Sequence, residues 1–277
     1  MAAQLTLQRL GGRPDVRSYL SSIWQRRQFA AAIAVGEVRS EHMDTALGNL
    51  WHVVNPLLQM GVYYLVFGLL IKTDRGVDNF LAFLAVGVFM FHYTQKSVTA
   101  GAKSLLKSQG LIRSIQFPRA ILPLSTVIAH GLTFVPAAGI MLVVALATGE
   151  RPAWVWLLLA PLFLLQTVFN TGGALLSARL ADRFPDVQNI LPFMFRITFY
   201  LSGVLFSATR VTADRDPRFL VLFNLNPIYA FLTAARSLVL DARVDPLLWG
   251  VATVWTALLL AIGFFAFRGG EHEYGRG

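Results

Sequence analysis

Six apolar stretches dominate this sequence, and each is long enough to cross the hydrocarbon core of a lipid bilayer. One helical crossing needs about 20 consecutive apolar residues. The stretches are continuous and do not alternate between apolar and polar residues, so spanning strands are not expected and helices must satisfy the backbone within the lipid. The sequence therefore predicts an all-α integral membrane protein with six transmembrane helices. We place these at 51–71, 80–100, 120–148, 153–177, 190–208 and 247–267.

The composition agrees with a membrane protein and narrows its chemistry. Apolar residues make up 55% of the 277 residues and charged residues 14%, which is unlike a water-soluble domain. The sequence has no cysteine, which excludes disulfides, thiol catalysis and cysteine-bound metals. It has no HExxH or Walker A motif, and the six stretches contain no Asp or Glu. We expect no catalytic residue, metal or cofactor in this chain.

The net charge of +9 is distributed between the apolar stretches, so we interpret it as an orientation signal and expect no nucleic-acid partner. With the N-terminus inside, 14 Lys and Arg residues face the cytoplasm and 8 face outward, five of them in the one long loop before the last stretch. Because positive charge favours the cytoplasmic side, both termini are predicted in the cytoplasm. The expected location is the plasma (inner) membrane.

Two segments outside the six crossings are also predicted to be helical. In residues 20–48, apolar residues recur at helical spacing among arginines, which indicates an amphipathic helix on the cytoplasmic surface. An ordinary soluble helix packed on a partner is the alternative. Residues 219–240 are apolar, but Asn224, Asn226 and Pro227 interrupt them, so we expect a pair of short re-entrant helices on the outer side. The predicted organisation is a cytoplasmic tail 1–19, the interface helix 20–48, a transmembrane domain 49–267 and a cytoplasmic tail 268–277.

A series of short motifs runs along most of the chain. They are Leu47-Gly48, Leu50-Trp51, Pro56, Val66-Phe67-Gly68, Phe117-Pro118, Leu122-Pro123-Leu124 and Asn226-Pro227 followed by Arg236. In this order, over about residues 20–267, they resemble the permeases of the ABC-2 polysaccharide and polyol-phosphate export family. The chain is most similar to Wzm-type permeases of O-antigen and cell-wall glycan exporters, in particular those for the galactan precursor of mycobacteria. It departs from them at Phe184-Pro185-Asp186, where relatives often carry an aromatic-Arg-Asp run.

The resemblance implies a transport subunit and not an enzyme. It would move a lipid-linked cell-envelope polysaccharide, galactan or O-antigen-like, to the outer side of the membrane. The implied partners are a second copy of the chain, membrane lipids and two copies of a separate ABC ATPase that holds ATP and Mg. A two-fold pair encloses a path more readily than six helices alone. An ABC-2 permease for a drug or small lipid, and a membrane-embedded glycolipid transferase using Asp182 and Asp186, are the rival functions.

The resemblance also implies that the basic segment 101–119 couples the chain to its ATPase, with the loop 179–187 as a second contact. Ordinary solvated loops are the alternative. The candidate coupling residues are Leu111, Ile112, Arg113, Phe117, Arg183 and Asp186.

Cations and aromatic residues inside the crossings are candidates for the substrate path. Lys96 and Arg196 either snorkel to lipid headgroups or attract the pyrophosphate of a lipid-linked glycan. Aromatic faces suit a sliding sugar chain because they pack on sugar C–H surfaces without a fixed hydrogen-bond pattern, and ordinary helix packing is the alternative. The aromatic candidates are Phe89, Phe91, Tyr93, Phe195, Phe199 and Tyr200, of which Phe195 and Phe199 share one helix face.

The short outer helices would, by the resemblance, form a gate built on Asn226, Pro227 and Arg236. We expect Asn226 to cap the second of them, and Arg236 to pair with a lipid phosphate or with Asp241. A purely structural hairpin is the alternative. In the fourth crossing, Gly172, Gly173 and Ser177 predict a close approach of helices.

Overall fold

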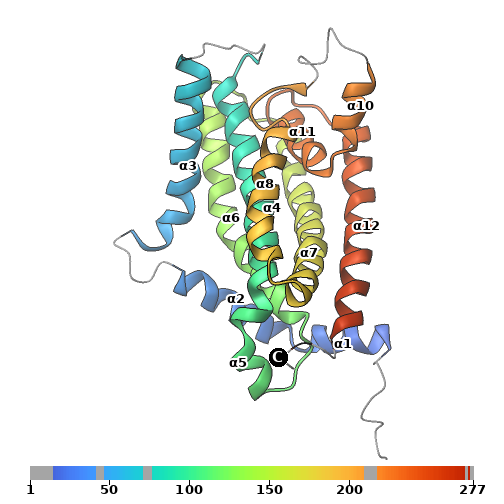
Figure 1. The fold of residues 1–277 in the computed structure, drawn as a ribbon. Coiled ribbons are helices and arrows are strands. Elements are labelled where there is room, and N and C mark those ends of the chain that lie inside the picture. Colours follow the sequence, from blue (N-terminus) through green and yellow to red (C-terminus); the bar gives the residue numbers. More distant parts are fainter. Residues whose placement is uncertain (1–14, 42–46, 71–76, 209–216, 272–273, 275–277) are drawn as a thin grey trace, which may run out of the picture.

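The computed structural model describes residues 15–41, 47–70, 77–208, 217–271 and 274. Every regular element in this part of the chain is helical, which confirms the all-α prediction. The helices form one bundle with short helices at its lower and upper ends (Figure 1). The elements are α1 (Val16–Gln25), α2 (Arg27–Ser40), η1 (Gly48–Leu50), α3 (Trp51–Tyr63), η2 (Tyr64–Leu70), α4 (Phe80–Lys107), α5 (Gln109–Ser114), α6 (Ile121–Ala147), η3 (Trp154–Leu158), α7 (Leu159–Arg183), α8 (Val187–Leu201), α10 (Pro217–Leu225), α11 (Pro227–Val239) and α12 (Pro246–Gly270).

Each predicted crossing corresponds to one or two helices of the bundle, and these differ in length. Among the described residues, α6, η3 with α7, and α12 are long and apolar enough by themselves to cross a membrane. Helix α3 with its π-helical continuation η2, helix α4 and helix α8 run alongside them (Figure 1). Helices α4 and α7 extend past their predicted ends, to Lys107 and Arg183. The chain is therefore a multi-pass membrane protein.

The fifth crossing differs from its prediction at 190–208. Helix α8 begins at Val187 and ends at Leu201, and its 15 residues rise about 22 Å, less than the hydrocarbon core of about 30 Å. The chain then leaves the helix through Ser202 and Gly203, whose φ of 63° lies in the left-handed region that glycine adopts easily. We call residues 202–208 the re-entrant segment.

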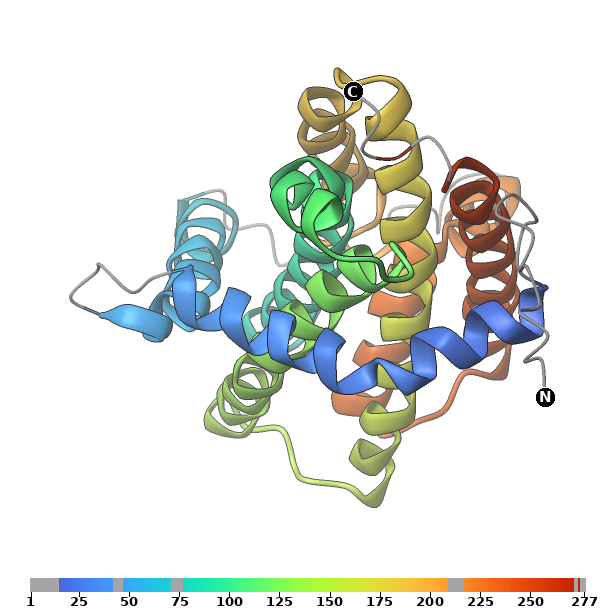
Figure 2. The ribbon, with the colours of Figure 1, turned by 90° about the horizontal axis from the view of Figure 1, so that it is seen from below.

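The interface helix also differs from its prediction at 20–48. It begins at Val16, capped by the Asp15 side chain, and it is broken at Arg26 into α1 and α2. Seen from below, the two helices run across the lower end of the bundle (Figure 2). Leu20 and Trp24 are exposed, as expected of a helix that rests on a membrane surface. Of the last residues predicted for this helix, 42–46 lie outside the described residues, and Gly48 already belongs to η1.

Residues 268–277, predicted as a cytoplasmic tail, include residues that pack against the lower end of the bundle. Helix α12 continues to Gly270, and Tyr274 is buried against Phe267. The Glu271 carboxylate accepts hydrogen bonds from the Tyr19 hydroxyl at 3.0 Å and from the Arg119 backbone N–H at 2.9 Å. These contacts fasten α1 and the start of α6 to the lower end of α12.

Candidate functional site

The re-entrant segment at the upper end is stabilised by the guanidinium of Arg236, which lies on α11 and is buried. Its Nη1 and Nη2 donate hydrogen bonds to the carbonyl oxygens of Gly203 and Val204, both at 2.7 Å. Its Nε and Nη2 also donate to the carbonyl oxygen of Phe83 on α4, both at 3.2 Å. Non-helical carbonyls within a membrane need such donors because no lipid group can replace them. Because Arg236 satisfies the carbonyls of the residues that follow Leu201, helix α8 can end there within the membrane.

The predicted pairing of Arg236 with Asp241 is not formed. The guanidinium carbon lies 3.3 Å from the centroid of the Phe83 ring, and the carbonyls of Phe83, Gly203 and Val204 occupy its donors. Instead, the Asp241 carboxylate Oδ2 lies 3.5 Å from the guanidinium Nη2 of Arg243. The predicted contact of Arg236 with a lipid phosphate stays a prediction.

Asn226 caps α11, as the sequence predicts. Its side-chain oxygen accepts from the N–H groups of Ile228 at 3.0 Å and Tyr229 at 3.4 Å, and Pro227 follows at the first helical position, where a missing N–H costs nothing. Its amide nitrogen donates to the Ser202 hydroxyl at 3.0 Å. Asn226 therefore joins the start of α11 to the start of the re-entrant segment.

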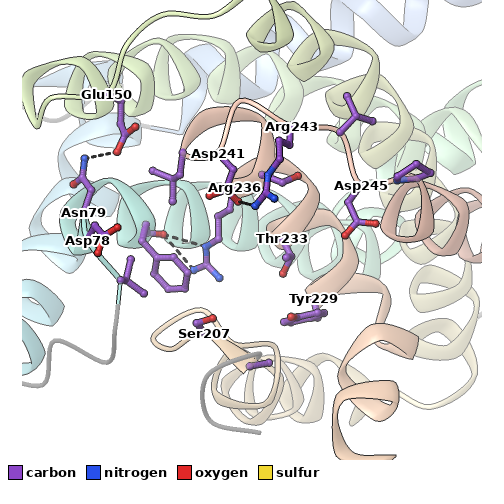
Figure 3. Close-up of a pocket in the computed structure, with 17 residues that line it drawn as sticks. Asp78, Asn79, Glu150, Ser207, Tyr229, Thr233, Arg236, Asp241, Arg243 and Asp245 are labelled. Atoms are coloured by element: carbon purple, nitrogen blue, oxygen red, sulfur yellow. Dashed lines mark hydrogen bonds and ion pairs between the residues drawn. The ribbon is translucent and has the colours of Figure 1, made fainter. Parts of the chain in front are cut away.

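A cavity of about 760 Å³ opens beside these residues at the upper end (Figure 3). Arg236 lies in its wall, with Ser207 on one side and Asn79 and Glu150 on another (Figure 3). The Asn79 amide donates to the Glu150 carboxylate at 2.8 Å and so ties the start of α4 to the loop before η3. The sequence gives no local sign of this cavity, because its walls come from segments far apart in the chain.

The predicted path residues on α8 divide between its two faces. Phe195 and Phe199 do share one face, but it is buried, with ring centroids 6.1 Å and 5.0 Å from Phe91 on α4. The opposite face is exposed and carries Arg196 and Tyr200. It also carries large apolar side chains that were not predicted for the path, of which Phe193, Met194 and Ile197 are examples. Phe193 lies three residues before Arg196, Ile197 lies three before Tyr200 and Met194 lies three before Ile197, so helical spacing was the available signal.

Phe89 and Tyr93 belong to the interior of the chain. Tyr93 stacks on Phe134 with centroids 4.8 Å apart and donates to the Thr167 hydroxyl at 2.9 Å, while Phe89 is buried in the same core. Both side chains also line the small cavity beside Lys96. That Phe89 and Tyr93 contribute to the substrate path stays a prediction.

Lys96 and Arg196 do not share a site. Lys96 is half-buried on α4 and lines a small cavity of about 30 Å³ with His52, His92 and His130, between α3, α4 and α6. Arg196 is exposed on α8. The sequence placed the histidines in separate segments, yet the fold brings these three together. The described part of the chain shows no group of acidic, His or Cys side chains arranged to hold a metal.

At the lower end, helix α5 projects below the bundle (Figure 1), and the predicted coupling residues divide between an inner and an outer side. Leu111 and Ile112 pack against the apolar cluster beneath the bundle, and the Phe117 ring lies 5.4 Å from Phe29 of α2. The exposed tip holds Arg113 and also Ile115, which the sequence analysis did not select.

The tip of α5 is joined to the break between α1 and α2. The Arg26 side chain donates to the Gln116 carbonyl oxygen at 2.5 Å. In the second loop, Arg183 lies over the exposed Phe184 ring at 5.7 Å and Asp186 is exposed. Asp182 lies 3.6 Å from Arg179, so the acidic pair considered for a transferase is not a free pair of carboxylates.

Comparison with known proteins identifies the family. The sequence pattern of the ABC-2 type transporter family matches residues 32–240. The chain is 28% identical over 242 residues to the O-antigen export system permease protein RfbA of Myxococcus xanthus, covering 86% of this chain and 91% of the relative. It is 25% identical over 210 residues to the RfbA protein of Klebsiella pneumoniae, covering 76% and 79%. It is 22% identical over 246 residues to the polysialic acid transport protein KpsM of Escherichia coli, covering 86% and 91%. The chain thus belongs to the ABC-2 type transporter family and is a membrane permease subunit whose ATPase is a separate protein.

Proposed function

We propose that this chain is the transmembrane half of an exporter that moves a lipid-linked cell-envelope polysaccharide from the cytoplasmic to the outer side of the membrane. The observation that carries the proposal is its similarity, over 76–86% of its length, to permeases named for O-antigen export and polysialic acid transport. The motif resemblance to mycobacterial exporters favours a galactan precursor, or an O-antigen-like glycan, as the cargo.

The distribution of charge supports an orientation with the lower end in the cytoplasm. Helices α1, α2 and α5 lie at that end with Arg113 and Arg183, and the end of α12 lies there too. The excess of Lys and Arg in these segments agrees with the positive-inside rule. Both termini then face the cytoplasm of a cell bounded by the plasma (inner) membrane.

A second copy of the chain completes the path. The exposed face of α8 carries Phe193, Tyr200 and Arg196, and α3 exposes further apolar side chains such as Leu58 and Val62. When two such faces meet around a two-fold axis, they line a lumen with aromatic side chains from both copies. The aromatic rings suit a sliding sugar chain, and Arg196 supplies a cation for the lipid-linked pyrophosphate.

Two copies of a separate ABC ATPase, which holds the ATP and Mg, drive the cycle from below. We expect them to contact Arg113 on α5, Ile115 directly after α5, and the loop with Arg183 and Asp186. Their motion then reaches α2 through the contact of Phe117 with Phe29. The pairing of Arg26 with Gln116 passes the same motion to the break between α1 and α2.

The upper end then forms the outer gate. Arg236 and Asn226 hold the re-entrant segment to α11, so a shift of α11 moves the segment with it. Pro227 fixes the start of α11 next to this joint.

Depletion of the chain tests the proposed cargo. Lipid-linked glycan is expected to accumulate on the cytoplasmic side, measured by its inaccessibility to an added glycosidase until the membrane is opened. If the glycan reaches the outer side at its normal rate, the rival of a drug or small-lipid permease replaces this proposal.

A further inference from the structure

A second cavity, of about 240 Å³, lies at the lower end where α2 crosses the end of α4 and the start of α6. Helices α1 and α2 lie across this end, with Leu20 and Trp24 exposed (Figure 2). With α1 and α2 on the cytoplasmic membrane surface, as the sequence predicts, the cavity lies at the level of the lipid headgroups. Its polar wall is unlike the neighbouring apolar cluster. Apart from Ile33 and Leu122, the lining residues are polar: Glu37, Lys107, Ser40, Ser104, Ser108, Ser125 and Thr126.

Four of the five hydroxyl groups of this wall already donate their hydrogen within their own helices and can only accept further hydrogen bonds. Ser104 donates its hydrogen to the Gly101 carbonyl at 2.7 Å, and Ser125 donates to Leu122 at 2.7 Å. Thr126 and Ser40 similarly donate to carbonyls of their own helices. A hydroxyl that has donated its single hydrogen retains only lone pairs. The cavity therefore suits a ligand that donates several hydrogen bonds.

The charges of the wall select the kind of donor. The Glu37 carboxylate lies 3.5 Å from the Lys107 ammonium, but its side chain is 18% exposed whereas that of Lys107 is 70% exposed. Burial raises the pKa of the Glu37 carboxyl, and Lys107 only partly opposes this effect. An uncharged sugar hydroxyl would not neutralise this carboxylate, whereas a primary ammonium donates three hydrogen bonds and supplies the opposite charge.

We propose that this cavity binds the headgroup of a resident zwitterionic phospholipid with a primary amine, phosphatidylethanolamine in kind. Its ammonium lies between Glu37 and the hydroxyls of Ser125 and Thr126, and its phosphate meets the exposed Lys107 at the mouth. The bound lipid joins α2 to α4 and α6, and it is distinct from the exported cargo. This site does not depend on what the cargo is.

The first test compares lipids on the unaltered protein. The permease with its ATPase is purified in detergent, and phosphatidylethanolamine, phosphatidylcholine or phosphatidylglycerol is added, with lipid retention read by native mass spectrometry. Phosphatidylethanolamine is expected to be retained about tenfold more strongly than phosphatidylcholine, whose methylated nitrogen donates no hydrogen bond. Equal retention of these two lipids overturns the proposal, as does preference for phosphatidylglycerol.

The second test uses variants of α2. Glu37→Gln keeps the shape of the side chain but removes its charge, and the preference for phosphatidylethanolamine is expected to be lost. Glu41→Gln is the matched control, because it removes the same charge one turn along the chain and does not line the cavity. A preference that persists in Glu37→Gln, or that disappears equally in Glu41→Gln, contradicts the assignment.

A third measurement identifies the source of the amine. Soluble phosphoethanolamine is added at the same concentrations as the lipid, and the thermal unfolding midpoint is recorded. Only the lipid is expected to raise the midpoint, because its acyl chains anchor the headgroup at the membrane surface. An equal rise with soluble phosphoethanolamine shows a site for a free amine and overturns the lipid assignment. These readouts need no transport, so they fail or succeed independently of the proposed export function.

Discussion

Among individual residues, we expect the side chain of Arg236 to contribute most to the stability of the upper end. Replacing it with Met leaves the carbonyls of Phe83, Gly203 and Val204 without their donor, and each buried carbonyl left unpaired costs about 1–3 kcal/mol. We expect Arg236→Met to lower the free energy of unfolding by about 3 kcal/mol or more, measured as a lower thermal midpoint in detergent. Arg236→Lys should fail to restore it, since a lysine lacks the planar fork that reaches carbonyls on two elements.

Arg243 provides the matched control for this change at the same end of the molecule. Its pair with Asp241 is exposed to solvent, so Arg243→Met should change stability by less than about 1 kcal/mol. If Arg236→Lys and Arg243→Met both retain the normal midpoint, the guanidinium is not what holds the re-entrant segment.

At the scale of helices, the packing of α7 on α12 depends on Gly172. A Cβ atom built on Gly172 would lie 2.6 Å from the backbone carbonyl carbon of Leu259, closer than real Cβ atoms come to a neighbour. We expect Gly172→Ala to push the two helices apart and destabilise the protein by about 1–3 kcal/mol. Gly139→Ala on α6 is the control, because nothing lies within 4 Å of its added methyl group. Equal thermal midpoints for the two variants would contradict this account.

Helix α5 is the element whose role is easiest to isolate. We expect Ile115→Glu to reduce the amount of ATPase that copurifies with the permease, because it places a charge in the centre of the proposed contact. Val244→Glu is a fair control, since Val244 is 44% exposed and Ile115 45%, and Val244 lines the cavity at the upper end. Loss of the ATPase from both variants, or from neither, argues against docking on α5.

The sequence predicts a helix well when neighbouring residues alone determine it. A bilayer imposes long apolar stretches, so the crossings are visible, and Asn226-Pro227 marks the start of α11 by its own cap. The end of α8 is not local, because the carbonyl of Gly203 is satisfied by Arg236, 33 residues later. The sequence also does not show which aromatic side chains point into the bundle. A helix that is apolar on all sides, such as α4 around Phe89, carries little sign of which side faces inward.

At the scale of the whole molecule, large apolar side chains are exposed on several sides of the bundle, on α3, α6 and α12 as well as on the exposed face of α8. What distinguishes the face of α8 is a cation among them. Lipid covers apolar side chains readily, but Arg196 on the same face of α8 is poorly suited to lipid. The proposed second copy, with a hydrated path between the two copies, would account for this combination.

Thiol cross-linking tests that arrangement directly, because the chain has no cysteine of its own. Single substitutions Phe193→Cys on α8 and Val143→Cys on α6 give two positions of similar exposure, 59% and 61%. With a short bifunctional thiol reagent in native membranes, Phe193→Cys is expected to yield the covalent dimer, because the two α8 faces meet at the proposed axis. Val143→Cys should remain monomeric on denaturing gels, because α6 then faces lipid. Dimer formation through Val143→Cys alone would place the two-fold axis on the other side of the bundle and remove α8 from the path.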